Sequence, residues 1–365
     1  MADLDQLNVA TKRYIRENPA LLDNFFNADP FAAYLKLNCR EDFSGGRLIG
    51  ENFFYDALNT GAYAKGAEFD ITEKQVEQQA QFDIKFHYAD VTLSKEDTQV
   101  LNTGPNAVFR LIDARMTNAY MALGSAFAIS LYLNGSRTGF TNLIRGLAEA
   151  LNDNSTVSWD NNTYSTYGGL TRGGTIGTAL NSVPANLART IEYSDLEEGY
   201  GDASWGGDAY EPNLGITTVL GYSFFKEKFQ TQQRFNNTQD PAIGFSGLKF
   251  NNATLLKSRY CPGKDITDTT PSLSNKLAVD FLKKSSGGVL TAYPTLSTAN
   301  SETLFWINAR IPYICLYVSS DAEFGFGFTG FKPAQGNTKV AGQALAALAL
   351  TVAPRYHKQI HSFTG

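Results

Sequence analysis

The stretch Asn106–Leu133, NAVFRLIDARMTNAYMALGSAFAISLYL, carries the longest helical pattern in the sequence. Its apolar residues recur at steps of three and four, which places them on one helix face: Val108, Ile112, Met116, Ala119, Leu123, Phe127 and Leu131. At 1.5 Å per residue the helix would be about 42 Å long. We therefore predict a spine on which other elements pack. Taken alone, the helix fits a buried core helix of an α+β enzyme equally well.

Composition restricts the class of protein. The chain has 365 residues and a formal net charge of −5, which is not the basic signature of a nucleic-acid-binding protein. The three cysteines lack metal-ligand spacing and indicate reduced thiols in a cytosolic chain: Cys39, Cys261 and Cys315. The N-terminus lacks the apolar core of a signal peptide, and no apolar run reaches about 18 residues. We therefore expect neither secretion nor a membrane span.

Residues 1–40 are predicted to form an extended arm with short helices, because Asn18-Pro19 and Asp29-Pro30 interrupt the pattern. The arm carries more aromatic side chains than it can bury by itself: Phe25, Phe26, Phe31 and Tyr34. We expect these side chains to lie on the main body or on a neighbouring copy.

Residues 41–95 predict a ribbon of two strands joined by a polar, glycine-rich tip. From Gln81 to Leu93 apolar and polar residues alternate, and we expect one face to be buried: Phe82, Ile84, Phe86 and Tyr88. A two-stranded ribbon is marginally stable alone in water. It should need a partner surface, which another subunit could provide.

The rest of the chain predicts short helices and strands. We expect helices at 141–151, 222–233 and 274–282, and strands at 190–193, 215–220, 248–260, 304–318, 323–331 and 344–352. Pro312 should break the strand at 304–318. The acidic cluster from Asp195 to Asp208 is interpreted as a solvated loop, because it lacks the alternating ligands of a calcium loop.

Motifs for cofactors, metals and catalysis are weak. Gly325, Gly327 and Gly330 have dinucleotide-binding spacing, but Lys332-Pro333 follows where a helix should begin, so we predict an aromatic strand. His357 and His361 could share a helix face as metal ligands, but we expect a solvated tail. No nucleophile setting is recognisable. We predict no catalytic site, no cofactor and no metal.

The order of these parts resembles the HK97-fold major capsid protein of tailed bacteriophages. The passage from Tyr88 through NTGPNAVFRLID is similar to that family's connection from ribbon to spine helix. YGGLTR at 167–172 is similar to a Gly-Gly-hydrophobic-x-Arg element of one branch. FQTQQRF at 229–235, GFSGLKF at 244–250 and the later CPG resemble that branch's central segment. Together the motifs cover most of residues 45–355.

The resemblance implies an α+β, HK97-like capsid fold. Its parts would be an N-terminal arm (1–49), an extended β-ribbon loop (50–82), a peripheral domain beginning at 83–139 with spine helix 106–133, an axial domain (140–302) and peripheral C-terminal strands (303–365). Subunits of this family form hexamers and pentamers of an icosahedral head around double-stranded DNA. The resemblance thus implies a structural virion protein, without enzymatic activity, that assembles in the bacterial cytoplasm.

The same resemblance implies partners. These are further copies of the chain, a separate scaffold protein, a portal and a possible decoration protein, with non-specific proximity to packaged DNA and no membrane. The candidate inter-subunit contacts are Phe25, Phe26, Phe31, Tyr34, Tyr63, Lys65, Glu68, Phe69, Arg172 and Arg234. Some members crosslink a loop lysine to a neighbour's asparagine. Lys65 lies at the tip, but no matching asparagine stands out, and we predict no crosslink.

Two other functions fit parts of the sequence. An encapsulin-like nanocompartment shell would share the fold and differ in its contents. A glycan-binding or glycan-processing β-rich protein would use the stretch from Trp159 to Tyr167 and the acidic residues near Trp205. The first alternative predicts large particles without a genome, and the second predicts a small oligomer with a saturable ligand.

Overall fold

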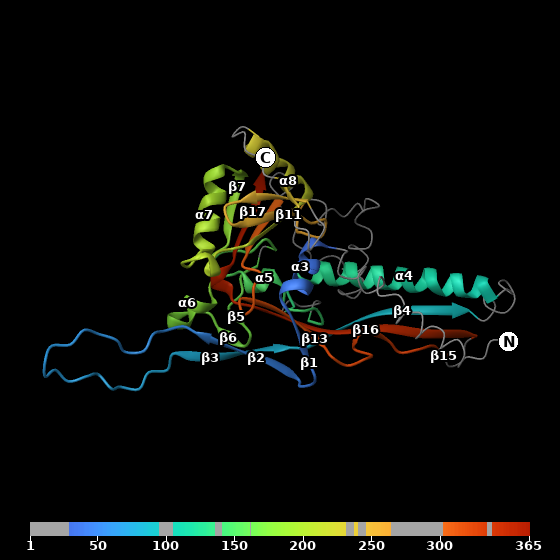
Figure 1. Ribbon diagram of the computed structural model, residues 1–365, viewed down its shortest axis with the longest axis horizontal. Helices are drawn as coiled ribbons and strands as arrows, with labels where there is room; N and C mark the ends of the chain where they lie inside the picture. Colours follow the sequence, from blue (N-terminus) through green and yellow to red (C-terminus); the bar gives the residue numbers. More distant parts are fainter. Residues whose placement is uncertain are drawn as a thin grey trace.

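The computed structural model describes residues 29–94, 105–135, 141–160, 162–230, 237–239, 246–263, 302–333 and 338–365. The predicted helix at 274–282 lies outside these residues. Figure 1 shows an elongated molecule, with a two-stranded ribbon projecting at one end and a long helix lying along a sheet at the other. A second sheet stands above the place where these parts meet.

The first sheet has six strands arranged around β16 (Lys339–Val352). Strands β13 (Ile314–Ser319), β14 (Gly325–Phe328), β15 (Lys332–Pro333) and β4 (Lys85–Ser94) all pair antiparallel with β16. Strand β1 (Arg40–Phe43) continues the sheet parallel to β13. The pairing of β4 with β16 is continuous from Ser94 opposite Lys339 to Lys85 opposite Leu348. The aromatic strand predicted near 323–331 is thus confirmed as β14.

The spine helix is confirmed as α4 (Pro105–Ser130), which runs along β4 and β16 in Figure 1. The predicted apolar face is buried from its second turn onward, at Ile112, Met116, Ala119, Leu123 and Phe127. The helix ends before the expected Leu133. The incoming chain accounts for this, because the amides of Gly146 and Leu147 donate to the carbonyls of Leu133 and Leu131. Added side-chain bulk at Gly146 would collide with these carbonyls.

The second sheet has seven strands in the order β7–β17–β12–β8–β11–β10–β9. Their bounds are β7 Ala185–Thr190, β8 Leu214–Thr217, β9 Asn237–Gln239, β10 Ser246–Phe250, β11 Ala253–Lys257, β12 Glu302–Ile307 and β17 Lys358–Thr364. The stretch predicted as a strand at 248–260 forms the hairpin β10–β11. Strands β12 and β17, from the stretch assigned above to the peripheral domain, pair here with β8 and β7. The chain therefore crosses from one sheet to the other at Pro312 and again after Val352.

The solvated tail predicted around His357 and His361 is wrong. Both residues are buried: His361 is part of β17, which lies between β7 and β12, and His357 directly precedes that strand. Ring nitrogens of His357 and His361 lie 3.1 and 3.0 Å from the carbonyl oxygens of Tyr313 and Val157. Burial lowers the pKa of each imidazole to about 4. The tail is a structural strand, and the carbonyl oxygens beside His357 and His361 lie within the fold.

The buried face predicted for 82–88 is correct for Phe82 and wrong for Phe86 and Tyr88. Phe86 is 64% and Tyr88 67% exposed, whereas His87 is buried beside Val91 and Leu93. The alternation reverses at Ile84, where the chain leaves the ribbon strand β3 (Glu77–Asp83) and begins pairing with β16 as β4. Because the pairing partner changes there, the buried face changes from even to odd positions.

Short helices complete the second half. They are α5 (Leu147–Ala150), α6 (Gly177–Leu180), α7 (Tyr193–Ala203) and α8 (Val219–Gln230). The predicted helix at 141–151 is thus reduced to one turn, and the strand predicted at 190–193 ends earlier, as β7. The loop predicted from Asp195 is wrong up to Ala203, where the chain is α7, whereas Glu198, Asp202 and Asp208 are exposed as predicted. Asp195 is a buried capping-box residue of α7 that pairs with Arg189, so this acidic cluster begins inside a helix.

None of the helices in the described ranges is long and apolar enough to cross a bilayer.

Candidate assembly surfaces

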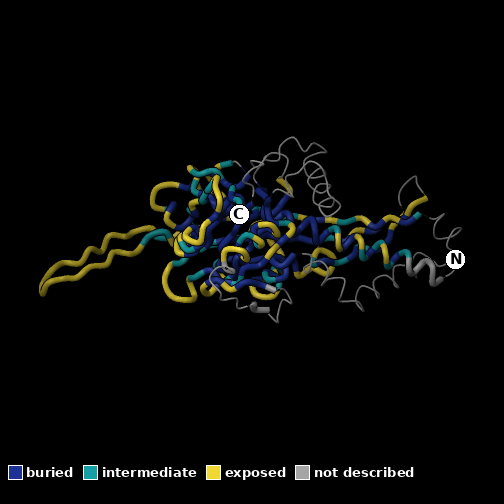
Figure 2. The backbone as a smooth tube through the Cα atoms, turned by 90° about the horizontal axis from the view of Figure 1, so that it is seen from above, coloured by how far each residue is buried: buried dark blue, intermediate teal, exposed yellow. Residues whose placement is uncertain are grey.

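The ribbon is formed by β2 (Leu48–Phe54) and β3, which pair antiparallel from Leu48 opposite Asp83 to Phe54 opposite Glu77. Residues 55–76 continue beyond this ladder as a long loop. Figure 2 shows the loop extending from the body with its surface almost entirely exposed. Residues 57–75 are all exposed, so this part of the loop is available to another molecule.

Side chains join the two arms of the loop where the backbone ladder has ended. The Asn59 amide donates to the Asp70 carboxylate (3.1 Å) and to the Thr72 carbonyl (3.2 Å). Lys74 forms an ion pair with Asp56 (2.8 Å) and donates to the Ala57 carbonyl. Exposed pairs of this kind contribute little energy singly. Because these bonds are spaced along the loop, they nevertheless hold its two sides together and give it a definite shape.

The loop tip carries apolar side chains that have no core to join. Tyr63 and Phe69 are about two-thirds exposed and pack on each other, with ring centroids 4.8 Å apart. Ile71 is 92% exposed. Lys65 and Glu68, the charged contact candidates, are exposed between the two rings in sequence. An aromatic pair held at the end of an ordered loop is typical of a surface that a partner covers.

The ribbon is fixed to the body by the hairpin of β5 (Thr166–Tyr167) and β6 (Leu170–Thr171). The amide of Gln81 donates to the Gly168 carbonyl at 2.7 Å. Tyr167 is fully buried, its ring 5.1 Å from that of Phe82, and its hydroxyl accepts from the Val352 amide. The YGGLTR motif therefore clamps the ribbon root onto β16.

A carboxylate adds a second attachment. Glu51, on β2, accepts hydrogen bonds from the hydroxyls of Tyr317 (2.6 Å) and Thr351 (3.3 Å) on β13 and β16. Burial and the bond to Glu51 raise the pKa of Tyr317, so its hydroxyl stays a donor. The role of Glu51 is not evident from the sequence, because an isolated acidic residue in a strand gives no signal of a partner some 300 positions away.

Several predicted contact residues belong to the subunit's own interior. Phe31 is fully buried on α3 (Pro30–Asn38), with its ring 5.8 Å from that of Tyr132. Arg172 is 3% exposed and donates to the backbone carbonyls of Leu180, Glu149 and Ala150. Neither side chain has surface left for a neighbour, so both predictions are wrong. Arg172 instead holds the hairpin of β5 and β6, the clamp hairpin, in place through these hydrogen bonds.

The other predicted contacts have different outcomes. Tyr34 is half-buried, and its hydroxyl accepts from the Asn213 side chain at 3.1 Å. Phe25, Phe26 and Arg234 lie outside the described residues. Tyr63, Lys65, Glu68 and Phe69 remain the accessible candidates, all on the loop tip.

The buried carboxylate of Asp29 lies where the N-terminal arm joins the body, a role that the sequence alone does not indicate. Asp29 caps α3, accepting from the amides of Phe31 and Ala32, and it also accepts from the hydroxyls of Ser258 and Tyr132. Burial raises its pKa to about 6 despite these hydrogen bonds. The arm helix, the end of the spine helix and the seven-stranded sheet thus meet at one titratable group.

No three His, Cys, Asp or Glu side chains of the described residues gather as metal ligands. Gly325 and Gly327 lie in β14, where backbone atoms of residues 319–323 leave no room for a Cβ, so these glycines serve packing. The stretch from Trp159 to Tyr167 is no glycan surface either, because Trp159, Tyr164 and Tyr167 are buried.

Comparison with known proteins adds to this geometry. No protein-family model matches the sequence, and a search of curated proteins gives no significant match. Among solved structures, the capsid asymmetric unit of cyanophage A-1(L) is 12% identical with a TM-score of 0.56, covering 92% of this chain and 93% of that chain.

Two further structures are similar over most of their length. The capsid of an empty GTA particle is 9% identical with a TM-score of 0.53, covering 91% of this chain and 90% of that one. The holo-SrpI encapsulin complex from Synechococcus elongatus PCC 7942 gives 9% identity and a TM-score of 0.53, covering 90% and 86%. With its projecting ribbon, spine helix and two sheets, the chain has the α+β HK97-like capsid fold.

Proposed function

We propose that this chain is a major capsid protein that self-assembles into hexamers and pentamers of an icosahedral phage head enclosing double-stranded DNA. The observation that carries the proposal is the projecting loop. It is ordered by Asn59 and Lys74, clamped at its root by Gly168, and ends in the exposed pair Tyr63 and Phe69. Such a loop has no function inside one subunit. It fits a chain that completes its hydrophobic contacts on a neighbour.

The domain division is part of the proposal. The six-stranded sheet with α4 corresponds to the peripheral domain, and the seven-stranded sheet corresponds to the axial domain. The axial domain then includes β12 and β17 from the C-terminal part of the chain, in addition to strands from 140–302. Residues 1–49 and 50–82 remain the arm and the extended loop.

The proposed role is structural, without catalysis. A net charge of −5 suits the inner wall of a shell filled with DNA, since tight phosphate binding would oppose packaging and release. The partners proposed are further copies of the chain, a scaffold protein, a portal and a possible decoration protein. Assembly would take place in the cytoplasm of a bacterial host, and the product would be the virion capsid.

Imaging of the purified chain tests the proposal. We expect closed shells, tubes or ring-shaped capsomers by negative-stain electron microscopy, and matching megadalton species by sedimentation. The same measurements at raised salt and with a crowding agent address weak assembly. A chain that stays a small monomer under all these conditions contradicts the proposal.

An encapsulin-like shell is the second candidate, favoured by the similarity to the SrpI encapsulin. Both functions require closed particles, so their contents separate them. Particles purified from the native source should contain double-stranded DNA if the chain is a capsid protein. Particles that contain protein cargo and no genome would favour the nanocompartment.

A further inference from the structure

Four aromatic side chains and one arginine form a continuous surface that the capsid fold does not explain. Tyr313 and Tyr356 have ring centroids 4.4 Å apart, and Tyr210 lies 6.0 and 6.2 Å from them. The Arg355 guanidinium stacks over Trp205 at 3.7 Å. Trp205 is 52% and Tyr210 is 44% exposed. We refer to Trp205, Tyr210, Tyr313, Arg355 and Tyr356 as the aromatic platform.

Hydrogen bonds hold the turn that carries Tyr210 in place. Tyr210 belongs to the turn Asp208–Tyr210, whose carbonyls point at two side chains that follow β12. Arg310 donates to the carbonyls of Asp208, Ala209 and Glu211, and the Asn308 amide also donates to Ala209. A turn fixed by several hydrogen bonds loses little conformational entropy on binding a ligand. The exposed rings are therefore held in place before any ligand arrives.

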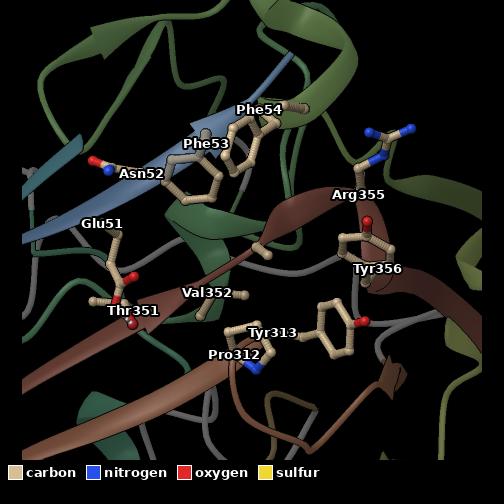
Figure 3. A pocket seen from close by; sticks show the side chains of 12 residues that line it. Glu51, Asn52, Phe53, Phe54, Pro312, Tyr313, Thr351, Val352, Arg355 and Tyr356 are labelled. Carbon is tan, nitrogen blue, oxygen red and sulfur yellow. Dashed lines mark hydrogen bonds between the residues drawn. The ribbon is translucent and has the colours of Figure 1, made fainter. Parts of the chain in front are cut away.

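A pocket of about 180 Å³ adjoins the platform and shares Tyr313, Arg355 and Tyr356 with it. Figure 3 shows the two tyrosines and Pro312 on one side and Phe53 and Phe54 of the ribbon root on the other. The pocket is lined mainly by apolar atoms. A ligand lying on the platform can thus place one substituent in this pocket.

The polar groups at the platform favour an uncharged, hydroxyl-rich ligand. The phenolic hydroxyls of Tyr210, Tyr313 and Tyr356 make no hydrogen bond to the described residues, and each can donate or accept. Arg355 supplies a positive charge, and the exposed carboxylate of Asp208 supplies a negative one. Opposite charges on one small surface select against a strongly charged ligand of either sign.

A pyranose ring matches this chemistry, because its C–H faces are apolar and its rim carries hydroxyl groups. The face of an aromatic ring can pack on the C–H face of the sugar, and the Tyr and Arg side chains can bind its hydroxyl groups. We propose that the aromatic platform and its pocket bind neutral hexose units of a glycan, with a sugar face on the open side of Trp205. This inference goes beyond the proposed capsid function and does not depend on it.

Fluorescence provides a direct test, because Trp205 is the exposed one of the three tryptophans and Trp159 and Trp306 are fully buried. We would titrate the unassembled chain with cellohexaose, maltoheptaose and chitohexaose, following emission and acrylamide quenching. At least one sugar should change the emission and protect Trp205 saturably. If none of the three does so, the proposal is wrong. Protection by polyproline alone would identify a peptide site and would also overturn it.

Variants locate the binding. Tyr210→Ala removes one ring and keeps the Trp205 reporter, so the sugar dissociation constant should rise about tenfold or more. Tyr210→Phe keeps the ring and should stay closer to the unaltered chain. Tyr88→Ala removes a more exposed tyrosine from the six-stranded sheet and should have no effect. If Tyr210→Ala and the unaltered chain have equal sugar dissociation constants, and thermal melting curves show that both are folded, the assignment is contradicted.

Assembled particles give a second readout. A shell repeats a weak site many times, so its retention on an immobilised form of the sugar should exceed that of the free chain by about a hundredfold or more. Particles in which Trp205 is shielded from acrylamide, and which fail to bind the sugar, would show that the platform is a contact between copies. That result would overturn the glycan proposal and leave the capsid function intact.

Discussion

Ala80 lies so close to Gly168 that a Cβ at position 168 would be only 2.6 Å from the Cβ of Ala80. Gly168 also has φ +56°, in the left-handed region that favours glycine. The contact joins the ribbon to the clamp hairpin, where the Gln81 amide donates to Gly168. The attachment of the ribbon therefore depends on the absence of one methyl group.

Gly168→Ala should loosen this attachment. We expect a loss of about 1–2 kcal/mol from the backbone conformation and of about 1–3 kcal/mol from overpacking, measured by urea unfolding of unassembled subunits. Gly169→Ala is the matched control, because Gly169 has φ +79° but no atom within 4 Å of its Cβ position. Equal losses in the two variants would mean that the approach of Ala80 is unimportant.

Asp29→Asn should change how stability depends on pH. The pKa of Asp29 is raised from 3.8 to about 6 in the folded chain, so folding favours the protonated form. This stabilisation is fully present below pH 3.8 and is lost as pH rises through 6, by up to about 3 kcal/mol. The free energy of unfolding of the unaltered chain, minus that of Asp29→Asn, should therefore fall between pH 4 and 7. A constant difference would contradict the burial of an ionisable group.

His87→Leu should stabilise the subunit. His87 is buried in β4, and neither ring nitrogen has a hydrogen-bond partner among the described residues. Burial lowers the pKa of His87 to about 4, so folding favours the neutral imidazole. As pH falls from 6.5 towards 4, the unfolded chain takes up a proton that the folded chain does not, and the unaltered subunit loses stability. We expect a gain of about 1 kcal/mol at pH 7 and a larger gain at pH 5 by urea unfolding. A destabilised variant would indicate a partner outside the described residues.

Much of the fold follows from local sequence patterns. The predictions that are wrong share one physical cause, which is strand pairing between segments remote in sequence. The spacing from Ile112 to Phe127 predicts α4, because helix periodicity depends only on near neighbours. The exposure of Phe86 could not be predicted, since it depends on whether β4 pairs with the ribbon or with β16. The burial of His361 likewise depends on β7 and β12, which are remote in sequence.

The candidate surface was only partly predictable for the same reason. Tyr63 and Phe69 are aromatic residues in a polar, glycine-rich stretch, a contrast that the sequence itself contains. Phe31 and Arg172 carry no such contrast, and only the complete fold places them inside. The platform around Trp205 joins side chains from three segments that no local pattern connects.

Shortening the loop tests its role in assembly. Deletion of Asn59–Asp70 should leave the subunit folded, because this tip makes no contact with the core, but it should block closed shells. The double variant Tyr63→Ser and Phe69→Ser is a milder change, which should weaken assembly without altering the urea midpoint. Sedimentation and negative-stain microscopy measure both. Normal shells from the deletion variant would show that the tip is dispensable.

The position of β17 has a consequence for biosynthesis. This strand, made from residues 358–364, lies between β7 and β12 in the seven-stranded sheet, so neither neighbour can complete its hydrogen bonds without it. Translation proceeds from the N-terminus, and residue 364 must leave the ribosome before the sheet can close. A nascent chain that has not yet exposed residues 358–364 therefore cannot present this finished sheet to another copy.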